Sequence, residues 1–524
     1  MNENCALSNA NPAKAKRRGR RTAEAQRIDQ VVRPGMESHR FTPLSEAEVK
    51  RVHTAALDVL EFVGMEQATP KIVELVTAKG GRLTEEGRLL FPRALVEEQI
   101  AATNRTFLLH GQDPKHDMDP HGDKVYTGTA GAAVHIIDPF TRKHRDSTLK
   151  DLYDVGRMVD KLDHIHFFQR VLVPRDLPDA YEMDINTCYA IVSSTTKHVG
   201  TSWLMPEHIT AAMPMLHAIA GGEKAWRERP FLSMSNCFVV PPLRFAPDSC
   251  DCIEVAVREG MPVLLADAGM AGATGPTALA GALVQAVAES LAGLVFVNLL
   301  KPGHPVIFGI WSLLVDLRSG AMCSGSGEQA ILAAACAQMG RFYDLATGNA
   351  AGMADAKLPD ARAGFEKGYS VSMVAHSGAN IVYEAAGMLG SLMSCCYESF
   401  VIDNEMLGNI NRTIRGIEIN EDSVSVEAIR RVCTGNGARH YLGDDQTMAL
   451  MNTEYLYPEI GDRLSPQEWE KAGSPDIVQQ ARVRVDQLLS THFPGHIPEE
   501  VDATIRASLP IRLPREAMQP EGTV

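Results

Sequence analysis

Between residues 164 and 405 the chain alternates between strand-like and helix-like segments, and this alternation constrains the fold more than any other feature. Eight short apolar runs each end at polar or small residues. Eight strand–helix units in succession predict a closed (β/α)8 barrel, in which the loops after the carboxyl ends of the strands carry the site. The predicted strands cover 164–173, 198–204, 231–238, 262–267, 305–311, 345–352, 379–385 and 399–406.

Longer segments with helical spacing separate the predicted strands. The strand at 262–267 illustrates the pattern, because its apolar run Val-Leu-Leu-Ala is followed directly by Asp267. Strands buried on both faces of a parallel sheet read as continuous apolar runs of this kind. We therefore assign residues 151–416 to a TIM barrel. Its predicted helices cover 179–194, 206–220, 247–259, 276–300, 327–341, 360–376 and 386–396.

Regions of different character flank this barrel. Residues 35–150 mix helical spacing with short β-rich runs, including a strand-turn-strand pattern at 124–138, and we expect an α+β region there. Residues 417–524 are mainly helical in pattern. Residues 1–34 carry eight Lys or Arg against three Asp or Glu. A flexible basic tail is the simplest interpretation, with a transit peptide or a nucleic-acid arm as alternatives.

The composition is that of an ordinary soluble protein. Hydrophobic residues make up 45% of the 524 residues and charged residues 22%, and the net charge is −14. This acidic balance argues against a nucleic-acid partner. The ten cysteines form no CxxC pair and no regular framework, which favours a reducing compartment and a cytoplasmic location.

One segment, residues 278–300, is long and apolar enough to require a membrane check. Gln285, Glu289 and Asn298 interrupt it, and two glycines lie inside it. A spanning helix needs about 20 residues with few polar interruptions. We therefore expect a buried barrel helix and no membrane association.

Polar and aromatic residues stand where most of the predicted strands end. A carboxylate beside an apolar barrel core must be solvated, paired or functional. For Glu384 and Glu405 a functional role and a structural ion pair remain equally open, whereas a turn or helix cap suits Asp267 better. Trp311 suits a cation–π site, although most tryptophans fill space. The candidate set is Gln169, Arg170, His198, Asn236, Asp267, Trp311, Asn349, Asp355, Tyr383, Glu384, Asp403 and Glu405.

Motifs for metal or nucleotide binding are weak. His164 and His166 share one face of a strand, but they fall at its start, on the stability side of a barrel. No complete ligand set is visible, so no tightly bound metal is expected. The glycine-rich segments match neither a dinucleotide fingerprint nor a P-loop.

Several segments together resemble one known family. The segment from Gly275 to Gln285 is followed by Glu289 and by the strand Pro305-Val-Ile-Phe-Gly309. Further matching segments are Gly325-Ser-Gly-Glu328, Ala333 to Gln338, Asp355-Ala-Lys-Leu-Pro-Asp360, Phe400-Val-Ile-Asp403-Asn-Glu405 and His440-Tyr-Leu-Gly443. In combination they resemble the trimethylamine methyltransferase (MttB-like) family over about residues 15–510.

This resemblance implies a TIM barrel that moves a methyl group from a methylated amine to cob(I)alamin. In that family the cobalamin (corrinoid) is presented by a separate corrinoid protein. Such a site needs an aromatic or acidic cradle for the cation and an open mouth for the corrinoid. A homo-oligomer is expected, because barrels of this size often associate.

The chain departs from the trimethylamine enzymes at one position. Those enzymes carry pyrrolysine in the loop after the sixth strand, where this chain has only standard residues, and Met353 stands near the equivalent position. The resemblance therefore points to a glycine betaine-like donor rather than trimethylamine. Arg170, His198 and Lys357 are candidate partners for a substrate carboxylate, although surface pairing is the commoner role of such residues.

The implied site divides into catalytic and substrate-binding residues. Glu384, Asp403 and Glu405 are the catalytic candidates, and Met353 joins the remaining strand-end residues as substrate-binding candidates. Two other functions stay open: a barrel lyase or hydrolase that uses Glu384, Asp403 or Glu405 as acid and base without a corrinoid, and a non-catalytic binder of quaternary amines.

Overall fold

The computed structural model describes residues 31–38, 41–435 and 439–520. Most of the expected basic tail, residues 1–30, lies outside the described residues. The chain divides into two compact units. One contains the helices α13 (Val426–Thr434) and α14 (Asp445–Glu454), and the other comprises Val32–Val424 with Leu456–Val524.

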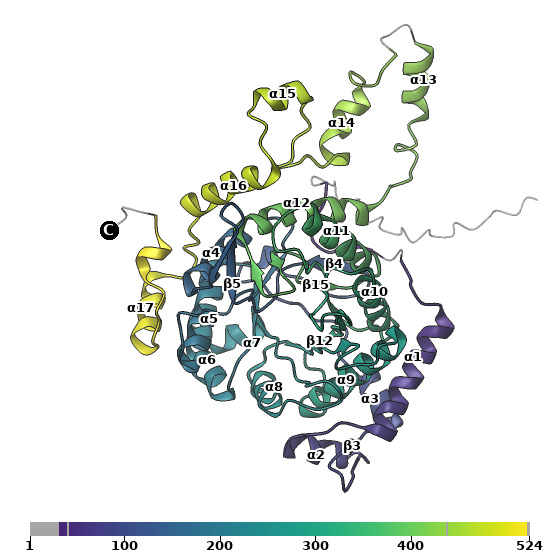
Figure 1. Ribbon diagram of the computed structural model, residues 1–524, viewed down its shortest axis with the longest axis vertical. Coiled ribbons are helices and arrows are strands. Elements are labelled where there is room, and N and C mark those ends of the chain that lie inside the picture. The colour runs from purple at the N-terminus through teal and green to yellow at the C-terminus, as the bar shows by residue number, and fades with distance from the viewer. Residues whose placement is uncertain (1–30, 39–40, 436–438, 521–524) are drawn as a thin grey trace, which may run out of the picture. The chain divides into compact units, whose positions relative to one another are not determined.

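The larger unit contains a barrel of eight parallel strands (Figure 1). Parallel pairing runs from β7 through each successive barrel strand to β15, and β15 pairs with β4. A parallel bridge between Gly128 and Phe167 joins β4 to β7 and closes the ring. The predicted (β/α)8 class is thus confirmed. The strands are β4 (Lys124–Thr127), β7 (Phe167–Gln169), β8 (His198–Thr201), β9 (Leu232–Met234), β10 (Val263–Leu264), β12 (Val306–Gly309), β14 (Thr347–Ala350) and β15 (Ile381–Tyr383).

The predicted strand at 399–406 is wrong, because this segment belongs to helix α12 (Tyr397–Arg415). Phe400, Leu407 and Ile414 recur at helical spacing and are buried on one face of α12. The predicted helix at 386–396 is also wrong, since that segment holds the short strands β16 (Met388–Leu389) and β17 (Ser394–Cys395). The missing barrel strand is β4, which lies within the region that we assigned to the amino-terminal part.

The other predicted barrel helices are present. They alternate with the strands and form the outer ring seen in Figure 1, together with α4 and α12. The helices of this ring before α12 are α4 (Leu149–Asp160), α5 (Ala180–Ser194), α6 (Pro206–Ala220), α8 (Pro247–Glu259), α9 (Leu279–Leu300), α10 (Gly327–Phe342) and α11 (Ala361–His376). A short helix, α7 (Glu223–Glu228), precedes β9.

Helix α9 is the apolar segment that required a membrane check. It is long and apolar enough to cross a membrane, but 78% of its most apolar stretch is buried inside the protein. Helices α1 (Glu46–Asp58) and α3 (Arg93–Ala102) pack on its outer side, and it lies against β12 on the inner side. Its apolar character is that of a barrel helix covered on both sides.

The amino-terminal region packs around this side of the barrel. Its other elements are β1 (Met36–Glu37), a π-helical turn (Val59–Val63), α2 (Pro70–Thr77), β2 (Arg82–Leu83), β3 (Leu89–Leu90) and a 3-10 turn (Pro114–His116). Leu109 and Met118 pair with each other and join the buried cluster inside the barrel. They close its amino end, since the neighbouring His110 carbonyl accepts a hydrogen bond from His198 at the start of β8.

A four-stranded sheet of β16, β17, β5 (His135–Asp138) and β6 (Lys143–Asp146) lies at the opposite, carboxyl end. β5 follows the carboxyl end of β4, and β16 follows that of β15. A second, two-stranded sheet of β11 (Met270–Ala271) and β13 (Leu313–Leu314) follows the ends of β10 and β12. These sheets surround the barrel mouth. Beyond the barrel come α15 (Pro466–Lys471), α16 (Ile477–Thr491), α17 (Glu499–Ser508) and a 3-10 turn (Arg515–Met518).

Candidate active site

Glu384 is the first residue after β15, and its backbone adopts the left-handed conformation, with φ of 62°. Its side chain is buried, with 2% of the residue exposed. No hydrogen-bond partner for its Oε2 occurs among the residues that the structure describes. Burial raises the pKa of Glu384 to about 8. A strained backbone with a buried, unpaired carboxyl is costly for a fold, and such residues cluster at functional sites.

Two other strands deliver polar atoms of the same kind to this end of the barrel. Within the described chain, Nε of Arg170 and Oδ1 of Asn349 are buried without a hydrogen-bond partner. Arg170 directly follows β7, and its Nη2 donates only a long hydrogen bond of 3.5 Å to Ser202 Oγ. Buried polar atoms in native proteins are nearly always satisfied. A group of unsatisfied ones at one barrel end therefore indicates a ligand site.

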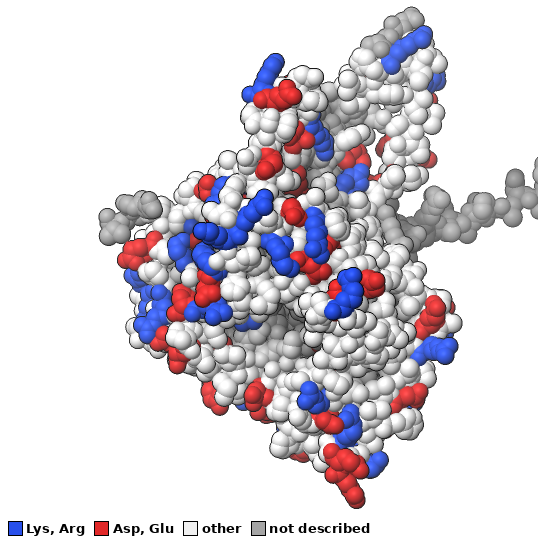
Figure 2. All heavy atoms as spheres, viewed as in Figure 1, with Lys and Arg blue, Asp and Glu red and all other residues white. Residues whose placement is uncertain are grey.

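Cys237, which follows the end of β9, lies among these groups. Arg170, Asp267 and Glu384 all act electrostatically on its thiol. Cys237 is solvent-exposed, yet burial raises the pKa of its thiol to about 11. A side chain that is both accessible and surrounded by protein lines a cavity. Figure 2 shows a hollow near the middle of this face of the barrel.

Aromatic side chains form one wall of the barrel mouth. The rings of Trp311 and Tyr383 lie 5.3 Å apart, and Trp311 Nε1 donates a hydrogen bond of 3.2 Å to the Gly348 carbonyl. Tyr383 also contacts Phe167, with ring centroids 5.1 Å apart. Trp311 is only partly buried. An indole fixed by a hydrogen bond at its edge can offer its face to a cation.

Met353 belongs to the same wall. It is buried with Leu313 and Ala350 in a small apolar cluster, against which Trp311 and Met322 also pack. The position where the resemblance places pyrrolysine is therefore filled here by an apolar side chain against the tryptophan.

Asp267 and Glu289 form a buried carboxyl pair beneath the mouth. Asp267 Oδ1 accepts a hydrogen bond of 3.1 Å from the Gly269 amide, and Glu289 Oε1 accepts one of 2.5 Å from the Leu243 amide. Burial and the neighbouring Glu289 carboxylate raise the pKa of Asp267 well above its usual value. A protonated Asp267 that donates to Glu289 satisfies both carboxyl groups and ties the loops after β9 and β10 to α9.

Asp403 and Glu405 do not end a barrel strand, because both lie on helix α12. Asp403 is buried, and its Oδ2 accepts hydrogen bonds from Lys367 Nζ (2.6 Å) and from the Gly387 amide (2.7 Å). The pair anchors the turn that follows Glu384. Glu405 accepts hydrogen bonds from three backbone amides, those of residues 459–461, and fixes the carboxyl-terminal segment rather than the mouth.

Three further candidates have their hydrogen bonds satisfied within the fold. Asp355 accepts hydrogen bonds from the Ser324 amide (2.7 Å), the Ser391 hydroxyl (2.6 Å) and the Gly325 amide (3.2 Å). Burial raises its pKa, but these hydrogen bonds outweigh that effect and leave the pKa below the usual value. Asp355 thus ties three mouth loops together.

Asn236 bridges to the backbone of Trp203 by accepting from its amide (2.9 Å) and donating to its carbonyl (2.6 Å). His198 lies at the amino end of the barrel and contacts Ser233 Oγ at 3.1 Å. Gln169 differs from these two, because its Nε2 donates to Ser235 Oγ at the carboxyl end. The structure therefore brings together Gln169, Arg170, Asp267, Trp311, Asn349, Met353, Tyr383 and Glu384, and it adds Cys237 and Glu289.

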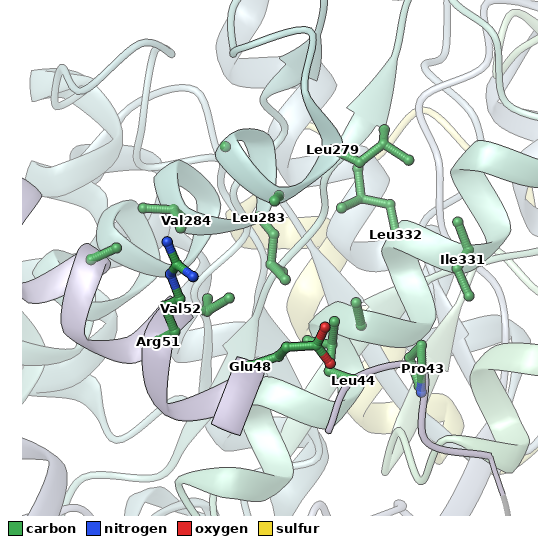
Figure 3. Close-up of a pocket in the computed structure, with 14 residues that line it drawn as sticks. Pro43, Leu44, Glu48, Arg51, Val52, Leu279, Leu283, Val284, Ile331 and Leu332 are labelled. Carbon is green, nitrogen blue, oxygen red and sulfur yellow. The ribbon is translucent and has the colours of Figure 1, made fainter. Parts of the chain in front are cut away.

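A cavity of about 550 Å³ lies elsewhere, on the outside of the barrel between α1, α9 and α10 (Figure 3). Its walls are apolar side chains such as Leu283 and Leu332, with Glu48 and Arg51 on α1. The Glu48 carboxylate caps α1 by accepting from Ser45. This cavity brings no reactive groups together.

The fold is that of a (β/α)8 barrel, and its mouth holds a candidate site for a small polar ligand. The family model for trimethylamine methyltransferase (MTTB) matches residues 12–512. The trimethylamine methyltransferase MttB of Desulfitobacterium hafniense is 30% identical over 485 residues, covering 92% of this chain and 96% of that protein. The glycine betaine methyltransferase of the same species (strain Y51) is 28% identical over 472 residues, covering 89% and 96%. The chain belongs to the trimethylamine methyltransferase family and is a methyltransferase.

Proposed function

We propose that this enzyme transfers a methyl group from a quaternary methylated amine, similar to glycine betaine, to the cob(I)alamin of a corrinoid protein. A tertiary amine is the second donor class. The observation that carries the proposal is the buried, unpaired carboxyl of Glu384 beside the Trp311–Tyr383 wall. The names of the relatives, one acting on trimethylamine and one on glycine betaine, support a methylated-amine donor.

The cationic end of the substrate would lie between Glu384 and the aromatic wall. Glu384 is ionised more readily when a cation is bound, because the positive charge offsets the desolvation that raises its pKa. The indole face of Trp311 adds a cation–π attraction of about 1–2 kcal/mol in a desolvated site. These groups hold the nitrogen and orient one methyl group toward the open mouth.

A betaine also carries a carboxylate, and Arg170 is the group that suits it. The Nε of Arg170 is buried and unpaired within the described residues, and Ser202 Oγ lies close to its Nη2. An N–H of guanidinium that donates to a carboxylate forms a charge-assisted hydrogen bond. Arg170 and Glu384 would then bind the two opposite charges of one zwitterion.

Met353 favours a quaternary donor over trimethylamine. Cob(I)alamin supplies a cobalt nucleophile that takes the methyl carbon, while the nitrogen keeps the electron pair of the broken bond. A quaternary nitrogen leaves as a neutral tertiary amine without further help, whereas a neutral tertiary amine must first be activated. The Met353 side chain offers no electrophile for that activation. Carboxyl, guanidinium and aromatic groups at the mouth suit an organic zwitterion, and the cobalamin would meet it from the open side.

The alternative function, a lyase or hydrolase that uses acid–base chemistry, has less support than methyl transfer. Of the three carboxylates on which it relied, Asp403 and Glu405 are engaged on α12, and only Glu384 faces the mouth. Asp267 also lies at the mouth, but it is paired with Glu289. Glu384 therefore has no free partner base, which fits a cation site better than a lyase or hydrolase.

The proposal is tested by incubating the enzyme with cob(I)alamin and a panel of amines. The panel contains glycine betaine, carnitine, proline betaine, choline, dimethylglycine and trimethylamine, and methylcobalamin is measured by its absorbance. We expect methylcobalamin from at least one betaine and little from trimethylamine. Binding of a betaine without methyl transfer would support the alternative that the protein is a non-catalytic binder of quaternary amines. Turnover of trimethylamine alone would overturn the proposed choice of donor.

A further inference from the structure

The sheet β16-β17-β5-β6 lies beside the candidate active site. Met388, the first residue of β16, follows Glu384 by only four positions. The connection from β4 to β5 is tied to the chain after β7 by the parallel bridge between Ala133 and Leu172. The hairpin of β5 and β6 therefore stands at the rim of the mouth, on the side where a large second substrate must approach.

This hairpin carries a run of exposed basic residues. Arg142, Lys143, His144 and Arg145 follow one another in the turn and in β6. Arg145 is neutralised by a bidentate pair with Asp151, at 2.7 and 2.6 Å. Asp138 lies opposite Lys143 in the register of β5 and β6, but its carboxylate accepts hydrogen bonds from the Phe140 and Thr141 amides. Arg142 and Lys143 thus form no direct ion pair within the described part of the chain.

Lys357 extends this positive surface along the rim. It is exposed, and its Nζ donates to the carbonyl of Asp355 (2.7 Å) rather than to a carboxylate. The loop that carries it is fixed to the hairpin, because Ala356 and Ile137 of β5 share one buried cluster with Leu389. Figure 2 shows several Lys and Arg side chains, with Asp and Glu among them, along one side of the hollow. We call Arg142, Lys143 and Lys357 the basic rim.

Two large apolar side chains lie next to the basic rim. Phe140 in the hairpin turn is 50% exposed and Met393 in the loop before β17 is 55% exposed. The Met393 carbonyl accepts a hydrogen bond of 3.3 Å from Val134. Apolar anchors bordered by charged groups are the usual composition of a protein interface.

We propose that the basic rim, with Phe140 and Met393, is the docking surface for an acidic face of the corrinoid protein. This inference rests on the function proposed above. The chain as a whole has a net charge of −14, so an acidic partner is repelled by most of its surface and attracted at the rim. Such an arrangement steers the partner to the mouth and raises the association rate.

The test compares two acceptors, free cob(I)alamin and the cobalamin-loaded corrinoid protein that supports the fastest wild-type turnover. The double variant Arg142→Glu/Lys143→Glu reverses two rim charges. The matched control is Lys50→Glu/Lys79→Glu, which makes the same change of charge at exposed, unpaired positions of the amino-terminal region. Rates are measured at low and at high ionic strength.

We expect the rim variant to slow methyl transfer to the corrinoid protein by on the order of tenfold at low salt. At about 1 M salt the difference should largely vanish, because the charges are screened within about 3 Å. Transfer to free cob(I)alamin should be the same in all three proteins, which also shows that the rim variant is folded.

Three outcomes would overturn the inference. The rim variant could react with the corrinoid protein as fast as the control, or no corrinoid protein could support turnover while free cobalamin does. The rim variant could also lose binding to a DNA duplex while its reaction with the corrinoid protein is unchanged. If the wild-type enzyme transferred no methyl group from any donor to free cobalamin, that result would instead contradict the proposed function itself.

Discussion

Glu384 shows how much of the site depends on one residue. A barrel strand normally alternates its side chains between the interior and the helices, and Tyr383 points into the core. The left-handed backbone at Glu384 breaks this alternation, and its carboxyl reaches the neighbourhood of Cys237 across the barrel. The raised pKa of this carboxyl leads to a first prediction.

Binding of a quaternary amine should depend on pH through Glu384. The free carboxyl is mostly neutral below about pH 8, and a permanent cation favours only its ionised form. Binding therefore releases a proton, and the association constant should rise with pH up to about 8 and then level off. Titration calorimetry of glycine betaine between pH 6 and 9 measures this slope. The variant Glu384→Gln should bind on the order of tenfold more weakly, with no slope; a pH-independent wild type would contradict the assignment.

Arg170 should decide between substrates with and without a carboxylate. The change Arg170→Gln removes the guanidinium, and we expect on the order of tenfold weaker binding of glycine betaine, the usual scale for a charge-assisted hydrogen bond. Choline has the same cation but no carboxylate, so its affinity should stay the same. Equal losses for both ligands would show that Arg170 only supports the fold of the mouth.

At the scale of elements, buried polar pairs hold the mouth loops in place. Lys367 on α11 pairs with Asp403 on α12, and together they fix the turn after β15. Asp267 and Glu289 tie two other loops to α9. Asp355 ties its own loop to the loops that contain Ser324 and Ser391. These pairs explain why carboxylates near strand ends in the sequence need not touch the substrate.

Removing one partner of the Lys367–Asp403 pair should be strongly destabilising. Lys367→Met leaves the buried Asp403 without a counter-ion, which costs about 3–5 kcal/mol of unfolding free energy. The double variant Lys367→Met/Asp403→Leu removes both charges and should recover most of that loss, as measured by urea unfolding. If the double variant were as unstable as the single one, packing rather than charge would explain the effect.

The Asp267–Glu289 pair should make stability depend on pH. The folded-state pKa of Asp267 is raised far above its value in the unfolded chain, so the folded protein binds more protons once the pH exceeds about 4. Its contribution to stability is therefore present at low pH and is lost as pH rises through the folded pKa. Asp267→Asn should flatten this part of the curve of unfolding free energy against pH. An unchanged curve would show that the pair shares no proton.

For the whole molecule, the sequence was sufficient for the barrel class and for most of its helices, because apolar runs and helical spacing are local signals. The eighth strand was missed for a local reason as well. The segment 399–406 has enough β-branched and aromatic residues to suggest a strand, whereas the true strand β4 lies far upstream and joins the barrel only by pairing with β15 and Phe167. Closure of a barrel is a long-range property that local patterns do not carry.

Some residues of the candidate site could be predicted from local sequence pattern, and others could not. Strand-end position selects Arg170, Trp311, Asn349, Tyr383 and Glu384 as candidates, and these five lie around the barrel mouth. The partners of Asp355 and Asp403 are loops and helices distant in sequence, so their structural roles could not be read from local pattern. Cys237 and Glu289 were not among the candidates predicted from the sequence, although Cys237 directly follows Asn236 at a strand end and Glu289 lies in a family-like segment.

The central claim is that the mouth around Glu384 is where a quaternary amine gives up its methyl group. It is tested most directly by single-turnover formation of methylcobalamin from cob(I)alamin and glycine betaine, in wild type and in Glu384→Gln, with trimethylamine as the comparison donor. We predict formation from glycine betaine that is at least on the order of tenfold slower in the variant at subsaturating donor, and little formation from trimethylamine. Equal rates in the two proteins, or transfer from trimethylamine only, would contradict the claim.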